Sequence, residues 1–212
     1  QMKNVYLRDI ILRYSVQDEA ALGEVMDVIA SGISTLTNPR KIASTMNSVH
    51  GTTTCDTTVD KYIGYAEEAF ILTRVKRYNV KGRKYIGTPY KIYFEDIGLR
   101  NARLAFRQIE GTHIMENIIY NELRFRGYQV DVGTVESRER DAGGKEVRIQ
   151  REIDFIATLG SKKYYIQSAY AIPDKEKYEQ ETMSFERTTD SFKKIIIVEK
   201  SMKPRYDENG YL

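Results

Sequence analysis

The stretch Leu72–Phe94, LTRVKRYNVKGRKYIGTPYKIYF, determines how the first half of the chain is interpreted. Its two arms, Leu72–Val80 and Tyr85–Phe94, are rich in β-branched and aromatic residues and are separated by Lys81-Gly82. This arrangement predicts a β-hairpin with Lys81-Gly82 in its turn. Residues 69–94 contain seven basic residues and no acidic residue, with four tyrosines interleaved. The hairpin is therefore expected to carry a concentrated positive charge.

The residues before the hairpin follow helical patterns. Asp18–Ile33 has apolar residues at i, i+3, i+4 and i+7, which is the pattern of an amphipathic helix. Asn38-Pro39 is a strong helix start and predicts a short helix as far as Met46. Thr57–Asp60 resembles a capping box and precedes a helical apolar stripe. Short helix, turn, second helix and basic hairpin together predict a winged helix-turn-helix.

The second half has a different order of elements. We expect a short helix over Ile97–Gln108 and a longer one from Thr112 to about Arg126. The expected order from that longer helix onward is α-β-β-β-α-β, and Ile195–Val198 is expected to lie in a strand covered on both faces. The remaining elements are predicted as strands Tyr128–Val135, Val147–Thr158 and Lys163–Ser168, a turn at Asp141–Gly144, a helix Lys175–Thr188 and a strand Lys193–Lys200. The fold class is thus α+β or α/β, with one domain at residues 1–98 and a second at 99–212.

Composition excludes several classes of protein. The chain has 212 residues, of which 41% are hydrophobic and 30% charged, as in ordinary globular proteins, and its net charge is only +3. A single cysteine, Cys55, excludes an internal disulfide and a cysteine-based zinc site. No apolar run approaches the ~18 residues of a membrane span. We expect a cytoplasmic protein with no membrane partner, and the start at Gln1 predicts a piece of a longer protein.

Neither a phosphate loop nor a catalytic nucleophile is predicted. Gly82 and Gly87 have the glycine spacing of a Walker A loop, but Thr88-Pro89 stands where Lys-Ser/Thr is needed. His50 lies near Cys55 in sequence without an orienting third group, and both are expected in a solvent-facing loop.

The basic hairpin and the helix before it are the candidate DNA-binding surface. Cations neutralise phosphates, and tyrosines contact sugars or stack on bases. Two alternatives remain open, which are a solvated hairpin and a hairpin docked on the acidic face of another domain. The candidate DNA-binding residues are Thr58, Lys61, Tyr62, Arg74, Lys76, Arg77, Lys81, Arg83 and Lys84.

Two carboxylates in the second half of the chain form a candidate metal site. Glu116 on a helix and Asp154 on a strand resemble positions of the PD-(D/E)XK nuclease fold, where acidic residues and a lysine converge on Mg²⁺ and water. The next strand carries Gln167 and Ala169 where that fold has an acid and a lysine. We therefore interpret these four positions as vestigial and predict no catalytic residue. If any metal is held, Glu116 and Asp154 are expected to hold it, and the lysines that would substitute are Lys162, Lys163 or Lys175.

Ordered motifs along nearly the whole chain resemble one family. The motifs are Asn4–Ile10, Lys91–Ala102, Glu116–Leu123 with Arg126-Gly127-Tyr128, Glu152–Ile156 and Tyr165–Gln167. They resemble a domain of uncharacterised function that forms the C-terminal portion of many prokaryotic AAA-type ATPases. The resemblance implies a winged helix followed by a nuclease-like domain, fed by an ATPase core. It also implies that ATP and Mg²⁺ belong to that core and that this segment needs no cofactor.

These observations favour a non-catalytic DNA-binding or regulatory module of an ATP-dependent protein. The alternative from another class is a Mg²⁺-dependent nuclease built on Glu116, Asp154 and a relocated lysine. A third hypothesis is a protein-interaction module whose basic hairpin packs on the ATPase core of the same polypeptide.

Overall fold

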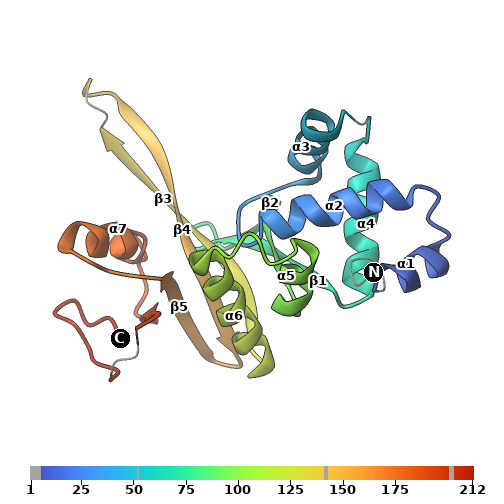
Figure 1. Cartoon of the computed structure of the whole chain (residues 1–212). Helices are drawn as coiled ribbons and strands as arrows, with labels where there is room; N and C mark the ends of the chain where they lie inside the picture. Colours follow the sequence, from blue (N-terminus) through green and yellow to red (C-terminus); the bar gives the residue numbers. More distant parts are fainter. Residues whose placement is uncertain (1–5, 52, 141–142, 201–202) are drawn as a thin grey trace. The chain divides into compact units, whose positions relative to one another are not determined.

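The structure, a computed structural model, describes residues 6–51, 53–140, 143–200 and 203–212. These residues form seven helices and six strands in a mixed α+β fold (Figure 1). The chain divides into two compact units. Unit 1 comprises residues 1–75 and 88–117, and unit 2 comprises residues 76–87 and 118–212. The predicted domain boundary after residue 98 lies within unit 1.

Helices make up most of unit 1. Asp18 caps α2 by accepting a hydrogen bond of 2.8 Å from the backbone N–H of Ala21. Asn38 caps α3 in the same way through Lys41 N, so these two predicted helix starts are confirmed. The capping box predicted at Thr57–Asp60 is wrong, because α4 begins at Asp56 and its N-cap residue, Cys55, makes no side-chain capping hydrogen bond. The helices are α1 (Leu7–Tyr14), α2 (Glu19–Ser31), α3 (Pro39–His50), α4 (Asp56–Glu68) and α5 (Ile97–Arg103), together with the first part of α6 (Gly111–Phe125).

The core of unit 1 forms where α2, α3 and α4 pack on one another. Leu22 and Met26 of α2, Met46 of α3 and Ile63 of α4 are fully buried there. Burial of such side chains stabilises the unit by about 1.5–3 kcal/mol each. The helical periodicity of the sequence therefore describes a real apolar face on each helix.

A short backbone bridge joins the segment between α2 and α3 to strand β2 (Lys84–Phe94). Thr37 N donates to Tyr90 O at 2.8 Å, and Tyr90 N donates to Thr37 O at 2.9 Å. Ser34 N also donates to Ile92 O at 3.1 Å. The helical layer of unit 1 is thus tied to the second strand of the hairpin.

The predicted hairpin is confirmed. Strand β1 (Leu72–Asn79) neighbours β2 in the sheet, and the chain reverses between them. Asn79 stabilises the reversal, because its Oδ1 accepts a hydrogen bond of 2.7 Å from Gly82 N. Arg83 completes the turn with a left-handed φ of 49°. The distal part of the hairpin, residues 76–87, belongs to unit 2.

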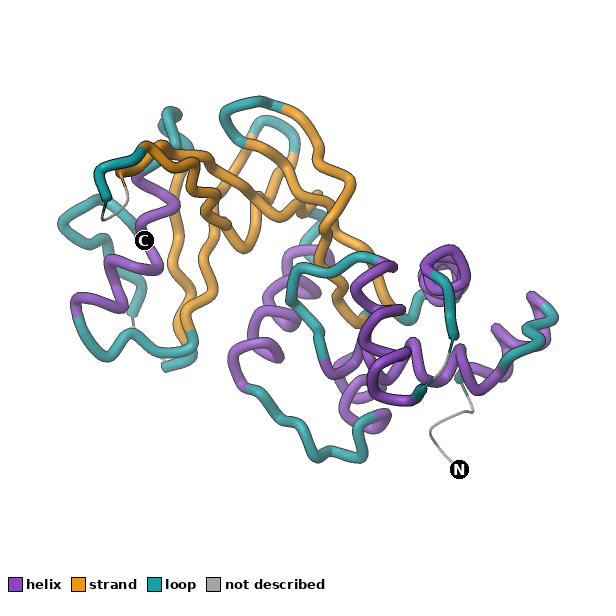
Figure 2. Tube along the Cα trace, turned by 90° about the horizontal axis from the view of Figure 1, so that it is seen from above, coloured by secondary structure: helices purple, strands orange, loops and turns teal. Residues whose placement is uncertain are grey.

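Unit 2 is built on a mixed sheet. The strand order is β2-β1-β3-β4-β5-β6, and Figure 2 shows the strands in orange. Strand β1 pairs with β3 in parallel through Arg77–Asn79, β3–β4 and β4–β5 are antiparallel, and β5–β6 is parallel. The predicted order α-β-β-β-α-β is confirmed. Its elements after α6 are β3 (Gln129–Arg140), β4 (Glu146–Leu159), β5 (Lys162–Ala169), α7 (Lys175–Glu186) and β6 (Lys193–Val198).

The core of unit 2 lies between the sheet and α7. Phe185 of α7 packs with Ile153 of β4 and Tyr165 of β5, and all three are buried. Strands β3 and β4 continue beyond this core as a two-stranded arm (Figure 1). Both strands are longer there than predicted, and Asp141 and Ala142 of the predicted turn lie outside the described residues.

Strand β6 differs from its prediction. Ile195–Val198 is only half-buried, so the expectation that both faces are covered is wrong. The reason is position, because β6 is the last strand in the sheet order and only β5 flanks it as a strand. On its outer side, Ile196 N donates to Leu212 O at 2.8 Å, and Leu212 N donates to Lys194 O at 3.1 Å.

Candidate nucleic-acid interface

Helix α4 presents part of the predicted recognition surface. Lys61 is exposed, with its Nζ 5.7 Å from the ring centroid of Tyr65, and Thr58 is half-buried. The expectation that Tyr62 faces outward is wrong. Its ring is 6% exposed and belongs to the core of unit 1, and its hydroxyl donates to the carbonyl oxygen of Asp18.

Two arginines of β1 are engaged inside their own units. Arg74 lies in unit 1 and forms ion pairs of 2.5 Å with Asp60 and with Glu67, so its charge is already compensated. Arg77 lies in unit 2 and is only 6% exposed, so its prediction as a surface cation is wrong. Its Nη1 donates to Gln150 Oε1 at 3.0 Å, and burial lowers the pKa of its guanidinium. Alternation along a strand assigns faces, but it does not show that the Arg77 side chain is buried and reaches Gln150 of β4.

The hairpin turn keeps its exposed cations. Lys76, Lys81, Arg83 and Lys84 are exposed and belong to unit 2. Lys81 Nζ donates to the carbonyl oxygen of Glu136 on β3, at 3.1 Å. The turn is therefore attached to the first strand of the β3–β4 arm, within the same unit.

A cavity of about 630 Å³ lies between the turn and this arm. We call it the basic cavity. Its polar lining also includes Asn79, Gly82 and Ser137. Among the described residues that line it, Glu136 is the acidic one. The cationic residues of the lining are Lys81 and Lys84 from the turn, Arg138 and Arg148 from the arm, and Arg187 from the end of α7.

The charges of the basic cavity are poorly balanced. Arg148 forms an ion pair with Glu136, and Arg138 Nη1 lies 3.7 Å from Glu146 Oε2, an exposed contact. Arg138 and Arg148 are directly opposite one another in the β3–β4 register. Like charges at directly opposed positions of antiparallel strands destabilise the pairing. The five cations of the described lining, set against Glu136 and Glu146, leave an excess of three positive charges.

Sequence reasoning missed Arg138, Arg148 and Arg187. Arg138 lies beyond Val135, where its strand was predicted to end, five residues before the observed end of β3 at Arg140. Arg148 lies in a predicted strand, but only the observed register places it opposite Arg138. Arg187 joins the cavity only through the packing of α7, and no local pattern indicates it.

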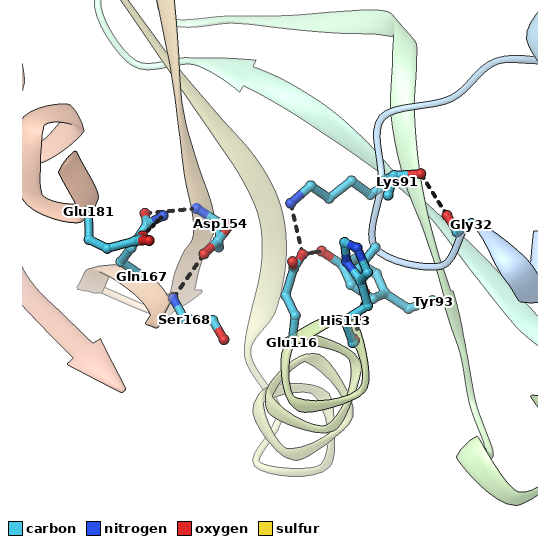
Figure 3. A network of polar contacts seen from close by, with 11 residues as sticks. Gly32, Lys91, Tyr93, His113, Glu116, Asp154, Gln167, Ser168 and Glu181 are labelled. Atoms are coloured by element: carbon cyan, nitrogen blue, oxygen red, sulfur yellow. Dashed lines mark hydrogen bonds and ion pairs between the residues drawn. The ribbon is translucent and has the colours of Figure 1, made fainter. Parts of the chain in front are cut away.

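The positions predicted as vestigial nuclease residues in unit 2 lie on β4 and β5 (Figure 3). Asp154 is 7% exposed, and its Oδ2 accepts a hydrogen bond of 2.9 Å from Ser168 N. Gln167 Nε2 donates to Glu181 Oε2 of α7 at 3.2 Å, and Ala169 is buried. Lys177 pairs with the other oxygen of Glu181 at 2.5 Å. The structure thus brings an acid and a lysine from α7 to Gln167, which sequence reasoning had not identified.

Two of the three lysines considered as substitutes have other contacts. Lys163 Nζ lies 5.1 Å from the ring centroid of Phe192, and Lys175 pairs with Glu179 at 3.6 Å. Lys162 is exposed at the start of β5.

Glu116 belongs to unit 1 and Asp154 to unit 2. Glu116 is buried, and its Oε1 accepts hydrogen bonds from Lys91 Nζ at 2.8 Å and from Tyr93 OH at 2.6 Å (Figure 3). Both carboxylates thus have hydrogen-bond donors within the protein, as buried carboxylates require. In the part of the chain that the structure describes, no group of three or more His, Cys, Asp or Glu side chains is arranged to hold a metal ion.

Cys55 stands at the N-terminus of α4, where its thiol is exposed. Its Sγ lies 3.1 Å from Thr57 Oγ1 and 3.2 Å from Thr58 Oγ1. Hydrogen bonds from the two threonines lower the pKa of the thiol from 9.0 to about 7. A thiol with a pKa of about 7 is about half ionised at neutral pH, which makes it more reactive than an ordinary cysteine.

Comparison with known proteins gives two matches. A family model described as "Domain of unknown function (DUF8612)" matches residues 1–110. An uncharacterised protein of Haemophilus influenzae is 33% identical over 197 residues, covering 93% of this chain. The chain spans 45% of the length of that relative. No solved structure matches the chain significantly. In the described part of the chain, no helix has the length and apolar character needed to cross a membrane.

Proposed function

The chain belongs to the family described as a domain of unknown function (DUF8612), and we propose that it is a non-catalytic DNA-binding or regulatory module. The basic cavity carries this proposal. Five cationic side chains from three separate segments surround one hollow, and two of them stand at the turn of the hairpin. Such a concentration of cations is suited to the phosphates of a nucleic-acid backbone.

The arrangement of unit 1 supports a winged helix-turn-helix. Helices α2, α3 and α4 pack together and are followed directly by the β1–β2 hairpin. The Thr37–Tyr90 bridge adds the short strand contact expected between the first two helices of such a fold and its wing. In this proposal α4 supplies the recognition helix, with Lys61 on its exposed side.

Unit 2 serves as a scaffold in this proposal. Its α-β-β-β-α-β order and its strand pairing are compatible with a degenerate PD-(D/E)XK-like domain, in which Gln167 and Ala169 have replaced the acid and the lysine of the strand. The domain then contributes Arg138, Arg148 and Arg187 to the basic cavity rather than a catalytic centre. Only the resemblance to the C-terminal domains of AAA-type ATPases suggests a cytoplasmic ATPase core in the same polypeptide. ATP and Mg²⁺ would bind to that core.

The test is fluorescence anisotropy with labelled duplex DNA over a salt series. Arg83→Glu/Lys84→Glu should weaken binding about equally for different sequences. The slope of log K against log salt should flatten by about 0.9 for each phosphate that the protein no longer neutralises, and so by about two units for the double variant. Lys61→Ala should act more on sequence preference.

A matched control is Arg126→Glu/Lys175→Glu. Both residues are exposed cations of unit 2 outside the basic cavity, and each pairs with a glutamate one helical turn away. This control should keep the parent slope. If the hairpin variant also binds DNA like the parent but no longer couples to an ATPase core supplied in trans, the protein-interaction hypothesis replaces the DNA-binding one.

A second candidate function is a Mg²⁺-dependent nuclease. The observation that favours it is the position of Glu181 and Lys177, which supply near Gln167 the charges missing from β5. We expect no cleavage when the protein is incubated with plasmid and Mg²⁺ or Mn²⁺. Nicking that is abolished in Asp154→Asn and in Lys177→Met, and retained in Lys175→Met, would establish the nuclease instead.

A further inference from the structure

We infer that the basic cavity is a binding site for a chain of consecutive phosphate groups, recognised by charge and without contact to a base. This inference rests on the proposed function, because a nucleic-acid backbone is one source of consecutive phosphates. A free oligophosphate is the other source. Both present the same chemistry to the cavity, and the experiment below separates them.

The residues that line the cavity indicate that it does not recognise a nucleic-acid base. Pockets for organic ligands are lined mostly by apolar and aromatic side chains, and bases bind proteins by stacking on aromatic rings. Among the described lining residues there is no aromatic and no aliphatic side chain. The side chains that complete the wall, Asn79 and Ser137, are hydrogen-bonding groups. The cavity therefore offers charges and hydrogen-bond donors to oxyanions, and its described lining has no aromatic ring on which a base could stack.

The number of charges indicates more than one phosphate. The described lining has five cations, of which Arg148 pairs with Glu136 and Arg138 with Glu146, so the excess is three positive charges. A single phosphate monoester carries at most two negative charges near neutral pH. It would leave part of the positive excess uncompensated. Two or three linked phosphate groups match the excess of three charges.

The placement of the charges gives the same indication. Lys81 and Lys84 come from the hairpin turn, Arg138 and Arg148 from the arm, and Arg187 from the chain after α7. The cations thus enter the cavity from three segments, instead of converging on one point. A volume of about 630 Å³ lies in the middle of the range of ligand sites, so it holds an extended anion together with water.

A polyanion in the cavity would contact two opposed arginines of the arm. Arg138 is directly opposite Arg148, and each pairs with one glutamate of the other strand. A bound polyanion adds charge-assisted hydrogen bonds to these side chains. Binding should therefore raise the melting temperature of the protein, since a ligand that binds only the folded state stabilises it.

Isothermal titration calorimetry and thermal unfolding with four probes test the inference. The probes are tripolyphosphate, ATP, adenosine and an oligoglutamate peptide. Tripolyphosphate and ATP should bind with similar affinity, and adenosine should not bind. Arg138→Gln/Arg148→Gln should weaken tripolyphosphate binding by more than about tenfold, since each charge-assisted hydrogen bond contributes at least a factor of that order.

The matched control is Arg126→Gln. Like Arg148, Arg126 is an exposed arginine of unit 2 paired with one glutamate, but it lies outside the lining. It should bind tripolyphosphate as the parent does. Lys84→Gln is a second variant that leaves the arm intact and should also weaken binding. The inference is overturned if tripolyphosphate does not bind at millimolar concentration, or if both cavity variants bind it like the parent. It is also overturned if ATP binds more than about tenfold more tightly than tripolyphosphate, or if oligoglutamate binds as tightly as tripolyphosphate.

Competition with labelled DNA separates this inference from the proposed function. If both are correct, tripolyphosphate displaces the DNA, and the cavity variants bind neither ligand well. If the variants fail to bind tripolyphosphate but still bind DNA, the cavity is a site for free oligophosphate. The proposal that the cavity binds DNA is then wrong. If the variants fail to bind DNA and the parent never binds tripolyphosphate, the proposed function stands and the inference fails.

Discussion

Replacing Glu116 by glutamine tests whether this carboxylate is structural. Its Oε1 accepts hydrogen bonds from Lys91 Nζ at 2.8 Å and from Tyr93 OH at 2.6 Å. The side chains of Lys91 and Glu116 are only 4% and 8% exposed. Glu116→Gln leaves the ammonium of Lys91 buried without its carboxylate. Breaking such a buried pair costs about 3–5 kcal/mol, and because the glutamine oxygen still accepts one hydrogen bond, we expect about 3 kcal/mol.

The assay is urea unfolding followed by far-UV circular dichroism and tyrosine fluorescence. Glu122→Gln is the matched control. It lies on the same helix, is exposed and pairs with Arg126 one turn away, so it should cost at most about 0.5 kcal/mol. Lys91→Met/Glu116→Leu should regain much of the stability, since an apolar pair can replace a buried ion pair. If Glu116→Gln is as stable as the parent or more stable, the reasoning is refuted, and Glu116 behaves as a carboxylate retained for binding.

Two further predictions concern single positions. Alkylation of Cys55 by iodoacetamide should rise with pH through about 7, because hydrogen bonds from Thr57 and Thr58 stabilise the thiolate. Thr57→Val/Thr58→Val should move the midpoint to higher pH, and an unchanged midpoint would contradict this cause. Gly133→Ala should destabilise the protein by about 1–3 kcal/mol in thermal unfolding, because its Cβ would lie 2.8 Å from Ile153 Cβ on the neighbouring strand. A variant as stable as the parent would show that β3 shifts to accommodate the methyl group.

Local sequence patterns predicted most of the elements of this protein. The helix starts at Asp18 and Asn38 depend on a side chain and the next few backbone N–H groups, so both could be found from the sequence. The hairpin turn after Asn79 depends on contacts within four residues. The order α-β-β-β-α-β followed in the same way from periodicity and turn residues.

Contacts between distant segments could not be predicted in this way. Periodicity assigns a residue to a face, but it does not say what covers that face. Arg77 was expected at the surface, but it is buried and bonds to Gln150 of β4, 73 residues later. Tyr62 was expected to face outward, and the core of unit 1 encloses it.

The candidate site shows the same division. Sequence alone identified Lys81 and Lys84, because charge segregation in a hairpin is a local property. It also identified Asp154, although not its bond to Ser168 N. Only the tertiary structure brings Arg187 to the basic cavity and places Arg138 opposite Arg148. Strand register and helix packing decide these positions, since they arise from the summed burial of many side chains and not from the residues at the site.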